Sequence, residues 1–396
     1  MGDFLNILVG DYELLNHDHY YVRIYDQMVK FDTIKSKLRT VGIKNVNYYT
    51  LNEAILFKDK TYVYFMFKQA DYTYSDDKRY FDKKLITALR ENNNIKLIYF
   101  IEDESIDINN FKLIDSYSNF EKLNQRNIYV YNNNANMNTF VKNISSNLNV
   151  YKSSFLPITY SKKFTKFNIE FKPDKKFLFL VQNRRLKPHR FATMCFLMKN
   201  NILPKTDWSF IENHMLGNFD FFKSIFLHNL LDDSSVYENE INVLANTIFK
   251  KNYHETTNDD SKYILDFIIP ETFLDSYINI TTESHFVESD IHITEKSFKP
   301  FYFYQIPIII GTYGHIKKMK ELYGYDFYED IVDHSYDNEI DPKKRLNMIL
   351  NEILRLSSIE TQVIEYYRLN AHRFEKNKMI TEELKNINET NFFYNL

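Results

Sequence analysis

The chain has 396 residues, a length that suits two α/β domains better than one. Its formal net charge of −3 gives no global positive field, which argues against a protein dedicated to binding nucleic acid. The single cysteine excludes an intramolecular disulfide and favours a reducing, cytoplasmic setting. No apolar run of about 18 residues occurs, so we expect no membrane span.

The first 160 residues alternate short apolar runs with segments of helical periodicity. Continuous apolar strands separated by helices indicate a parallel sheet that is covered on both faces. We expect strands over 4–9, 62–67, 95–101 and 127–131, and helices over 24–41 and 78–91.

The periodicity breaks between residues 151 and 176, where seven lysines and two prolines gather. We interpret 161–176 as a solvated linker between domains, with a basic patch beside a cleft as the alternative.

A second alternating region follows the linker. We expect strands over 177–181, 277–281 and 306–310, and helices over 188–200, 295–304, 343–356, 358–371 and 372–388. The sequence thus predicts an α/β protein with two Rossmann-like domains facing across a cleft. We place the domains at 1–160 and 177–371, and expect the final segment, 372–396, to form a helix that returns to the first domain.

The most informative segment runs from residue 277 to residue 311: a strand, an acidic loop, a short helix and a buried strand that ends in glycine. Thr294, Glu295 and Lys296 stand where that helix should begin. A carboxylate, an ammonium group and free backbone N–H groups would then meet at one helix N-terminus, which suits a ligand with hydroxyls and a diphosphate. Pro300 lies inside the expected helix and should kink or shorten it.

Several common cofactor motifs are missing from the sequence. Neither GxGxxG nor GxxxxGK[ST] occurs, which argues against a dinucleotide oxidoreductase or a P-loop enzyme. Neither CxxC nor HExxH occurs, and the eleven histidines show no metal-ligand spacing.

Two segments, 176–201 and 276–314, resemble the donor-binding half of GT-B glycosyltransferases, and the fucosyltransferase-like group most of all. The resemblance rests on an Asn-x-Arg-rich turn (Asn183 to Arg190), on Glu283, on an Ile-Thr-Glu-Lys box (293–296) and on a Pro-aliphatic-Gly strand (307–311). It covers about half of the chain. It implies a GT-B fold, an origin in a virus or a bacterium, and a place in the cytoplasm, the host's if viral.

The resemblance also implies roles for particular residues. Arg190 and Lys296 would contact the diphosphate, and Glu295 would accept hydrogen bonds from the ribose hydroxyls. Asn183, Arg184, Glu283 and Thr294 complete the expected donor-binding set. Charge on the leaving diphosphate needs a metal or fixed cations, and the chain has no Asp-x-Asp metal motif, so we expect no metal and no cofactor.

The expected activity is an inverting transfer of a sugar from GDP-fucose or a similar nucleotide sugar to a glycan or protein-linked acceptor. Such a transfer needs a general base, and acidic residues just beyond strand ends are the candidates: Asp11, Glu102 and Asp103. Two alternatives stay open. One is a phage-type glycosyltransferase acting on modified DNA, and the other is a binding protein on a GT-B-like scaffold without catalysis.

Overall fold

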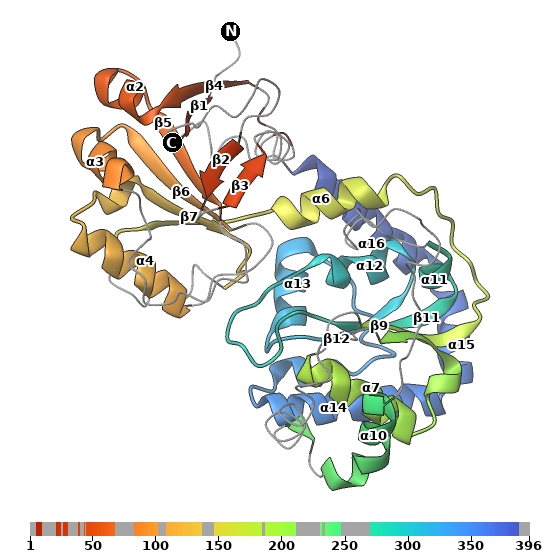
Figure 1. The fold of residues 1–396 in the computed structure, drawn as a ribbon. Helices are drawn as coiled ribbons and strands as arrows, with labels where there is room; N and C mark the ends of the chain where they lie inside the picture. Colours follow the sequence, from red (N-terminus) through yellow and green to blue (C-terminus); the bar gives the residue numbers. More distant parts are fainter. Residues whose placement is uncertain are drawn as a thin grey trace. The chain divides into compact units, whose positions relative to one another are not determined.

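The computed structural model describes residues 5–9, 21–24, 27–30, 39, 43, 45–67, 83–101, 108–136, 146–183, 187–210, 230–231, 234–246 and 270–387. The chain divides into two compact units, one of Met1–Tyr160 with Leu384–Leu396 and one of Ser161–Glu383. Each unit has a parallel β-sheet with helices packed on it (Figure 1). The expectation of an α/β protein with two parallel sheets is therefore confirmed, and the arrangement is consistent with two Rossmann-like units.

The first unit is built on a six-stranded parallel sheet in the order β4-β1-β5-β6-β7-β8. Its strands are β1 (Leu5–Val9), β4 (Val46–Thr50), β5 (Tyr62–Phe67), β6 (Ile95–Ile101), β7 (Ile128–Asn132) and β8 (Asn149–Lys152). Its helices are α2 (Leu51–Leu56), α3 (Lys83–Glu91) and α4 (Ile108–Phe120). Continuous apolar runs form the middle strands because both faces are buried, as for Leu97 and Val130, which are 0% exposed.

The helix expected over 24–41 is wrong in its first part. The chain forms an antiparallel pair instead, β2 (Tyr21–Ile24) and β3 (Gln27–Lys30), in which Val22 lies opposite Val29. Side chains at helical spacing suggested a helix, but β-branched residues pair well across two strands, and that pairing prevails here.

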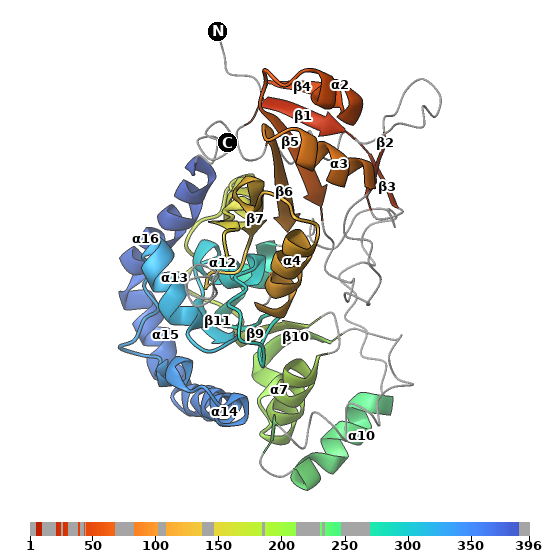
Figure 2. The ribbon, with the colours of Figure 1, turned by 90° about the vertical axis from the view of Figure 1, so that its left-hand side faces the viewer.

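The second unit has a four-stranded parallel sheet in the order β10-β9-β11-β12. Its strands are β9 (Phe177–Asn183), β10 (Thr206–Phe210), β11 (Ser276–Thr282) and β12 (Ile306–Ile310). Its helices are α6 (Phe155–Phe164, which begins in the first unit), α7 (Pro188–Lys199), α10 (Glu238–Asn246), α11 (Pro270–Leu274), α12 (Glu295–Tyr302), α13 (His315–Tyr323), α14 (Pro342–Ser358), α15 (Glu360–Leu369) and α16 (Ala371–Glu383). Helices α7 and α14 cover one face of the sheet, and α12 and α13 cover the other, in both views (Figures 1 and 2). Helix α12 ends two residues after Pro300, as expected for a proline inside a helix.

The segment expected as a linker is more ordered than a solvated connector. Helix α6 continues to Phe164, whose ring stacks on Tyr302 with centroids 5.3 Å apart. Lys175 donates from Nζ to the carbonyls of Ser276 (3.1 Å) and Tyr304 (2.8 Å). Burial lowers the pKa of this amine well below its usual value. The expected linker thus packs against the N-terminal end of β11 in the second sheet.

Helix α16, expected to return to the first unit, packs within the second. Phe374 is fully buried and stacks on Tyr328 with centroids 4.4 Å apart. Asn377 and Thr381 are also fully buried, and Asn377 is hydrogen-bonded to the backbone N–H and carbonyl of Asp326. Two of the three buried residues of α16 are therefore polar and hydrogen-bonded, which an apolar pattern does not reveal. Only the residues from Leu384 onward group with the first unit.

Within the described residues, no helix is long and apolar enough to cross a membrane.

Candidate functional site

The candidate site lies at the point in the second sheet where the strand order reverses, between β9 and β11. Strand β9 leads through α7 to β10 on one side, whereas its other neighbour, β11, leads through α12 to β12 on the opposite side. The segments that follow β9 and β11 therefore diverge, and open parallel sheets bind ligands in the crevice that such a divergence leaves at the C-terminal ends of the strands. Asn183 ends β9 and Glu283 follows β11, so both stand at this edge.

The end of β9 is joined to the end of β11 by side chains. Asn183 is buried, and its Oδ1 accepts a hydrogen bond of 2.5 Å from Thr282 Oγ1. In the described part of the chain its Nδ2 has no hydrogen-bond partner. Helix α7 starts after Lys187, which supplies no side-chain cap, and the Lys187 ammonium donates to the Ser284 carbonyl at 2.5 Å. Arg184 lies outside the described residues.

Arg190 has a structural role that the sequence did not suggest. It is 4% exposed, and its Nη2 donates to the carbonyls of Thr282 and Glu283, both at 3.2 Å. His189 lies 3.0 Å from the same Glu283 carbonyl through Nε2. Arg190 thus stands at the expected edge of the sheet but ties α7 to the end of β11.

Glu283 is a fully buried carboxylate with several donors. It accepts hydrogen bonds from Ser297 Oγ (2.5 Å), Thr294 Oγ1 (2.7 Å) and the N–H groups of Ser284 (3.2 Å) and Thr294 (3.3 Å). Burial alone would raise its pKa, but the Lys296 charge, His315 and the two hydroxyls outweigh burial and hold the pKa at about 2. Glu283 is therefore ionised, and it fixes the loop after β11 to the start of α12.

Helix α12 begins where the sequence predicted. Thr294 is its N-cap, and its Oγ1 accepts from the Lys296 N–H at 3.3 Å. The Thr294 N–H is itself engaged by Glu283. The free N–H groups expected at this helix start are thus partly occupied by the protein's own oxygens, and the side chain of Lys296 is what the helix start offers to an anion.

Lys296 is the partly exposed charge at the helix start, and Glu295 lies buried beside it. The Lys296 Nζ lies 3.3 Å from Glu295 Oε1, 3.0 Å from Thr294 Oγ1 and 3.4 Å from Ser284 Oγ. Its side chain is 28% exposed, whereas that of Glu295 is 9% exposed. Burial opposes ionisation of Glu295, but the charges of Lys296 and Lys299 lower its pKa overall. Two ammonium groups, from Lys187 and Lys296, therefore meet at Ser284.

The structure adds residues at the end of β12 that sequence reasoning missed. His315, 1% exposed, lies 2.9 Å from Ser297 Oγ through Nε2. Since the single Ser297 hydroxyl proton goes to the ionised Glu283, the His315 Nε2–H donates to Ser297. Neither His315 Nδ1 nor Thr312 Oγ1 has a hydrogen-bond partner within the described residues. The signal for this group is the run Gly-Thr-Tyr-Gly-His, which follows a buried strand and opens a helix.

The start of α13 is closed to an external anion by the protein itself. Asp337 accepts hydrogen bonds from the N–H groups of Ile316 (3.0 Å) and Lys317 (2.9 Å). Gly311 leaves room for the His315 ring, because a Cβ at this position would lie 3.1 Å from His315 Nδ1. The backbone N–H groups at the start of α13 are therefore already engaged by Asp337.

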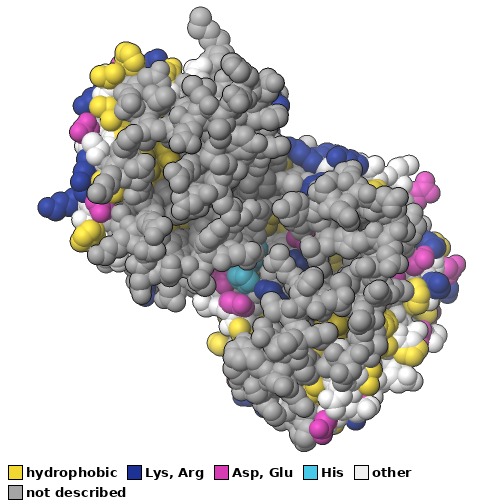
Figure 3. Space-filling model, in the orientation of Figure 1, with side chains coloured by type: hydrophobic (Ala, Val, Ile, Leu, Met, Phe, Trp, Pro, Cys, Tyr) yellow, Lys and Arg dark blue, Asp and Glu magenta, His cyan; other side chains and the backbone are white. Residues whose placement is uncertain are grey.

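The loop between β11 and α12 also reaches the surface. On the face shown in Figure 3, described acidic, basic and histidine side chains come to the surface together over this loop. Among its own residues, His285 pairs through Nδ1 with Asp290 Oδ2 at 2.8 Å.

The expected general bases Asp11, Glu102 and Asp103 lie outside the described residues, so the structure does not place them. No group of three or more His, Cys, Asp or Glu side chains that could hold a metal ion occurs in the described ranges.

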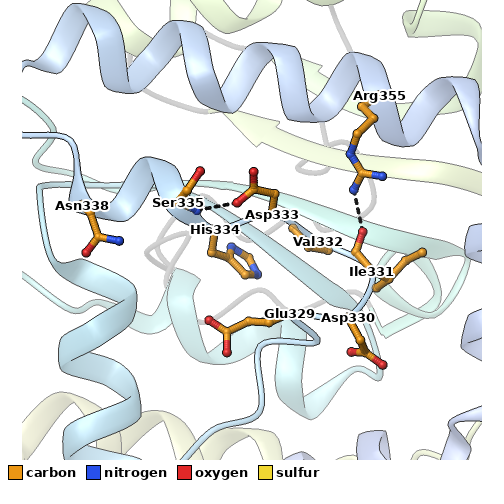
Figure 4. A pocket seen from close by; sticks show the side chains of 9 residues that line it. All are labelled: Glu329, Asp330, Ile331, Val332, Asp333, His334, Ser335, Asn338 and Arg355. Carbon is orange, nitrogen blue, oxygen red and sulfur yellow. Dashed lines mark hydrogen bonds between the residues drawn. The ribbon is translucent and has the colours of Figure 1, made fainter.

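A separate pocket of about 390 Å³ lies between the loop after α13 and helix α14 (Figure 4). Two of its polar side chains are engaged by residues outside the pocket: Asp330 accepts from Tyr366 (2.7 Å) and Arg373 (2.7 Å), and His334 uses both ring nitrogens, on Tyr336 and Phe327. We therefore do not assign it as the functional site. It is lined by Glu329, Asp330, Ile331, Val332, Asp333, His334, Ser335, Asn338 and Arg355.

Comparison with known proteins gives this chain no family. No family model matches the sequence, and no curated protein matches it.

Proposed function

We propose that the second unit binds the diphosphate of a nucleotide sugar at the C-terminal ends of β9 and β11. The observation that carries the proposal is that the ammonium groups of Lys187 and Lys296 both contact Ser284, one at its carbonyl and one at its hydroxyl. Ser284 lies beside the point where the strand order of the sheet reverses. Fixed cations at such a point suit a doubly charged phosphate group. Glu295, held beside Lys296, is suited to accept hydrogen bonds from ribose hydroxyls.

The activity that this binding site serves best is glycosyl transfer by a GT-B enzyme. Two parallel α/β units agree with that fold, and the residues that the sequence shares with the fucosyltransferase-like group gather at one edge of one sheet. Lys296 would stabilise the charge that develops on the departing diphosphate. The proposed donor is GDP-fucose or a similar nucleotide sugar, and the acceptor is a glycan or a protein-linked sugar.

The alternative of a DNA acceptor has less support. A duplex channel would be lined by the basic linker and by the cluster from Arg184 to Arg190, and Arg190 is buried and bonded to carbonyl groups. No described feature favours a scaffold without catalysis.

A panel of nucleoside diphosphates in a thermal-shift assay tests the proposal. At about 100 times its dissociation constant, a bound ligand adds roughly 2.7 kcal/mol to the stability. We expect GDP to raise the melting temperature more than GMP, and the purified protein to hydrolyse GDP-fucose slowly in the presence of EDTA. No shift with any nucleoside diphosphate would refute the proposed site, and loss of hydrolysis on chelation, restored by Mg²⁺ or Mn²⁺, would show that the phosphate site needs a metal.

A further inference from the structure

Glu283 is bonded to two residues that contact the ammonium group of Lys296. Its carboxylate accepts hydrogen bonds from the hydroxyl of Thr294 (2.7 Å) and from the N–H group of Ser284 (3.2 Å). Lys296 Nζ lies 3.0 Å from that Thr294 hydroxyl and 3.4 Å from the hydroxyl of Ser284. One buried carboxylate therefore fixes the places of two residues around the charge proposed for the diphosphate.

The hydrogen-bonding capacity of the Thr294 hydroxyl is used up inside the protein. A hydroxyl offers one proton and two lone pairs. The three neighbours of Thr294 Oγ1 are Glu283 Oε2 (2.7 Å), Lys296 Nζ (3.0 Å) and the backbone N–H of Lys296 (3.3 Å). The ionised carboxylate can only accept and both groups of Lys296 can only donate, so the proton goes to Glu283 and the lone pairs go to Lys296. The side chain that carries this hydroxyl belongs to a residue that is 3% exposed.

A second hydroxyl binds the same carboxylate but leads to another neighbour. Ser297 donates to Glu283 Oε1 at 2.5 Å, and its oxygen lies 2.9 Å from His315 Nε2. Thr294 and Ser297 thus each give Glu283 one hydroxyl hydrogen bond, but the first continues to Lys296 and the second to His315. The two hydroxyls therefore form a matched pair for mutation.

We propose that Thr294 is a positioning residue of the diphosphate site: its hydroxyl, oriented by Glu283, holds the Lys296 ammonium group in place and does not contact the nucleotide. This rests on the proposed binding of a nucleoside diphosphate. A lysine side chain has many rotamers, and an acceptor that holds its ammonium group before the ligand arrives reduces the entropy lost on binding. The role differs from the expected one, in which Thr294 is a contact of the donor.

Three variants separate the hydroxyl of Thr294 from its shape and from the support of Glu283. Thr294→Val keeps the shape and removes the hydroxyl, and we expect GDP affinity to fall about threefold to tenfold, the usual worth of one hydrogen bond. Thr294→Ser keeps the hydroxyl and should bind GDP within about twofold of wild type. Ser297→Ala removes the other hydroxyl from Glu283 and should also stay within about twofold, because it leaves the contact of Thr294 with Lys296 in place.

A double-mutant cycle with Lys296→Met shows whether Thr294 acts through the lysine. A residue that acts through Lys296 has no further effect once that lysine is gone, so the double variant should bind GDP as Lys296→Met does. A direct contact with the nucleotide, or loss of the helix cap alone, would weaken binding by the same factor in both backgrounds. Isothermal titration calorimetry measures all four affinities.

Several results would overturn the positioning role and leave the diphosphate site in place. These are equal factors in the two backgrounds, wild-type affinity in Thr294→Val, and a loss in Thr294→Ser or Ser297→Ala equal to that in Thr294→Val. A crystal structure of the wild type with GDP tests the role without any variant: Lys296 Nζ should contact the phosphate and Thr294 Oγ1 together, and a hydrogen bond from Thr294 to the nucleotide would contradict it. Absence of GDP binding by the wild type would refute the site and the role together.

Discussion

Lys296 is the residue on which the proposed diphosphate site depends most. Its ammonium group is partly exposed and lies beside Ser284 and Glu295. We expect Lys296→Met to weaken GDP binding at least tenfold, because one fixed charge next to the phosphate is lost. Isothermal titration calorimetry measures this, with Lys317→Met, an exposed lysine on α13, as the matched control. Equal affinities in the two variants would exclude Lys296 from the site.

Glu283 should make the stability of the second unit depend on pH in the acidic range. Its folded-state pKa of about 2 is below the ordinary value of 4.5 for a glutamate, so its ionised form stabilises the fold above pH 4.5. That contribution should decline as the pH falls from about 4.5 through about 2. Urea unfolding of the wild type and of Glu283→Gln at a series of pH values measures it. We expect the variant to be less stable at neutral pH and to lose less stability on acidification; parallel curves would contradict the ionised, bonded state of Glu283.

At the level of single residues, the sequence predicted those next to the helix start and missed those that depend on neighbouring strands. Thr294 to Lys296 could be predicted because a capping threonine before a charged first turn is a local signal. His315 could not, because its partner Ser297 comes close only when β11 and β12 lie side by side. Arg190 was placed at the correct edge, but whether an arginine faces a ligand or a carbonyl is decided by the fold.

At the level of elements, helix α16 offers a direct test of where the end of the chain is held. Phe374 is fully buried against Tyr328, whereas Met379 on the same helix is 63% exposed. We expect Phe374→Ala to lower the free energy of unfolding by about 3–5 kcal/mol, the usual cost of a large cavity. Met379→Ala should change it by less than about 0.5 kcal/mol. Chemical denaturation measures both, and similar values for the two variants would mean that α16 does not pack as described.

Prediction of the elements succeeded where the chain is buried on both sides and failed where it is polar. Strand β12 was predicted with its observed bounds, because five consecutive apolar residues before a glycine leave few alternatives. Strand β10, with the sequence TDWSF, was missed because it is short and polar, and it is recognised only through its pairing with β9. Residues 24–30 were misassigned because their apolar spacing fits a helix as well as a strand pair.

At the level of the whole molecule, two parallel α/β units could be predicted from alternating apolar strands and helices, but the packing of helix α16 within the second unit could not. Hydrophobic periodicity indicates that a helix has a buried face without indicating what covers it. Two of the three buried residues of α16, Asn377 and Thr381, are polar. They are hydrogen-bonded inside the second unit, as in the bond of Thr381 with Tyr325 at 2.9 Å.

Because each unit is compact by itself, binding of GDP should slow amide hydrogen exchange mainly in the second unit. A ligand that holds the loop after β11 to the start of α12 suppresses local opening there, and amides in those segments then exchange more slowly. We expect hydrogen exchange with saturating GDP to slow across residues 283–297 and around the start of α7, while peptides of the first unit, such as 95–101, stay unchanged. Lys296→Met at the same GDP concentration serves as the control, since its amides should resemble those of the unliganded protein. Protection confined to the first unit would place the nucleotide there and contradict the assignment of the site to the ends of β9 and β11.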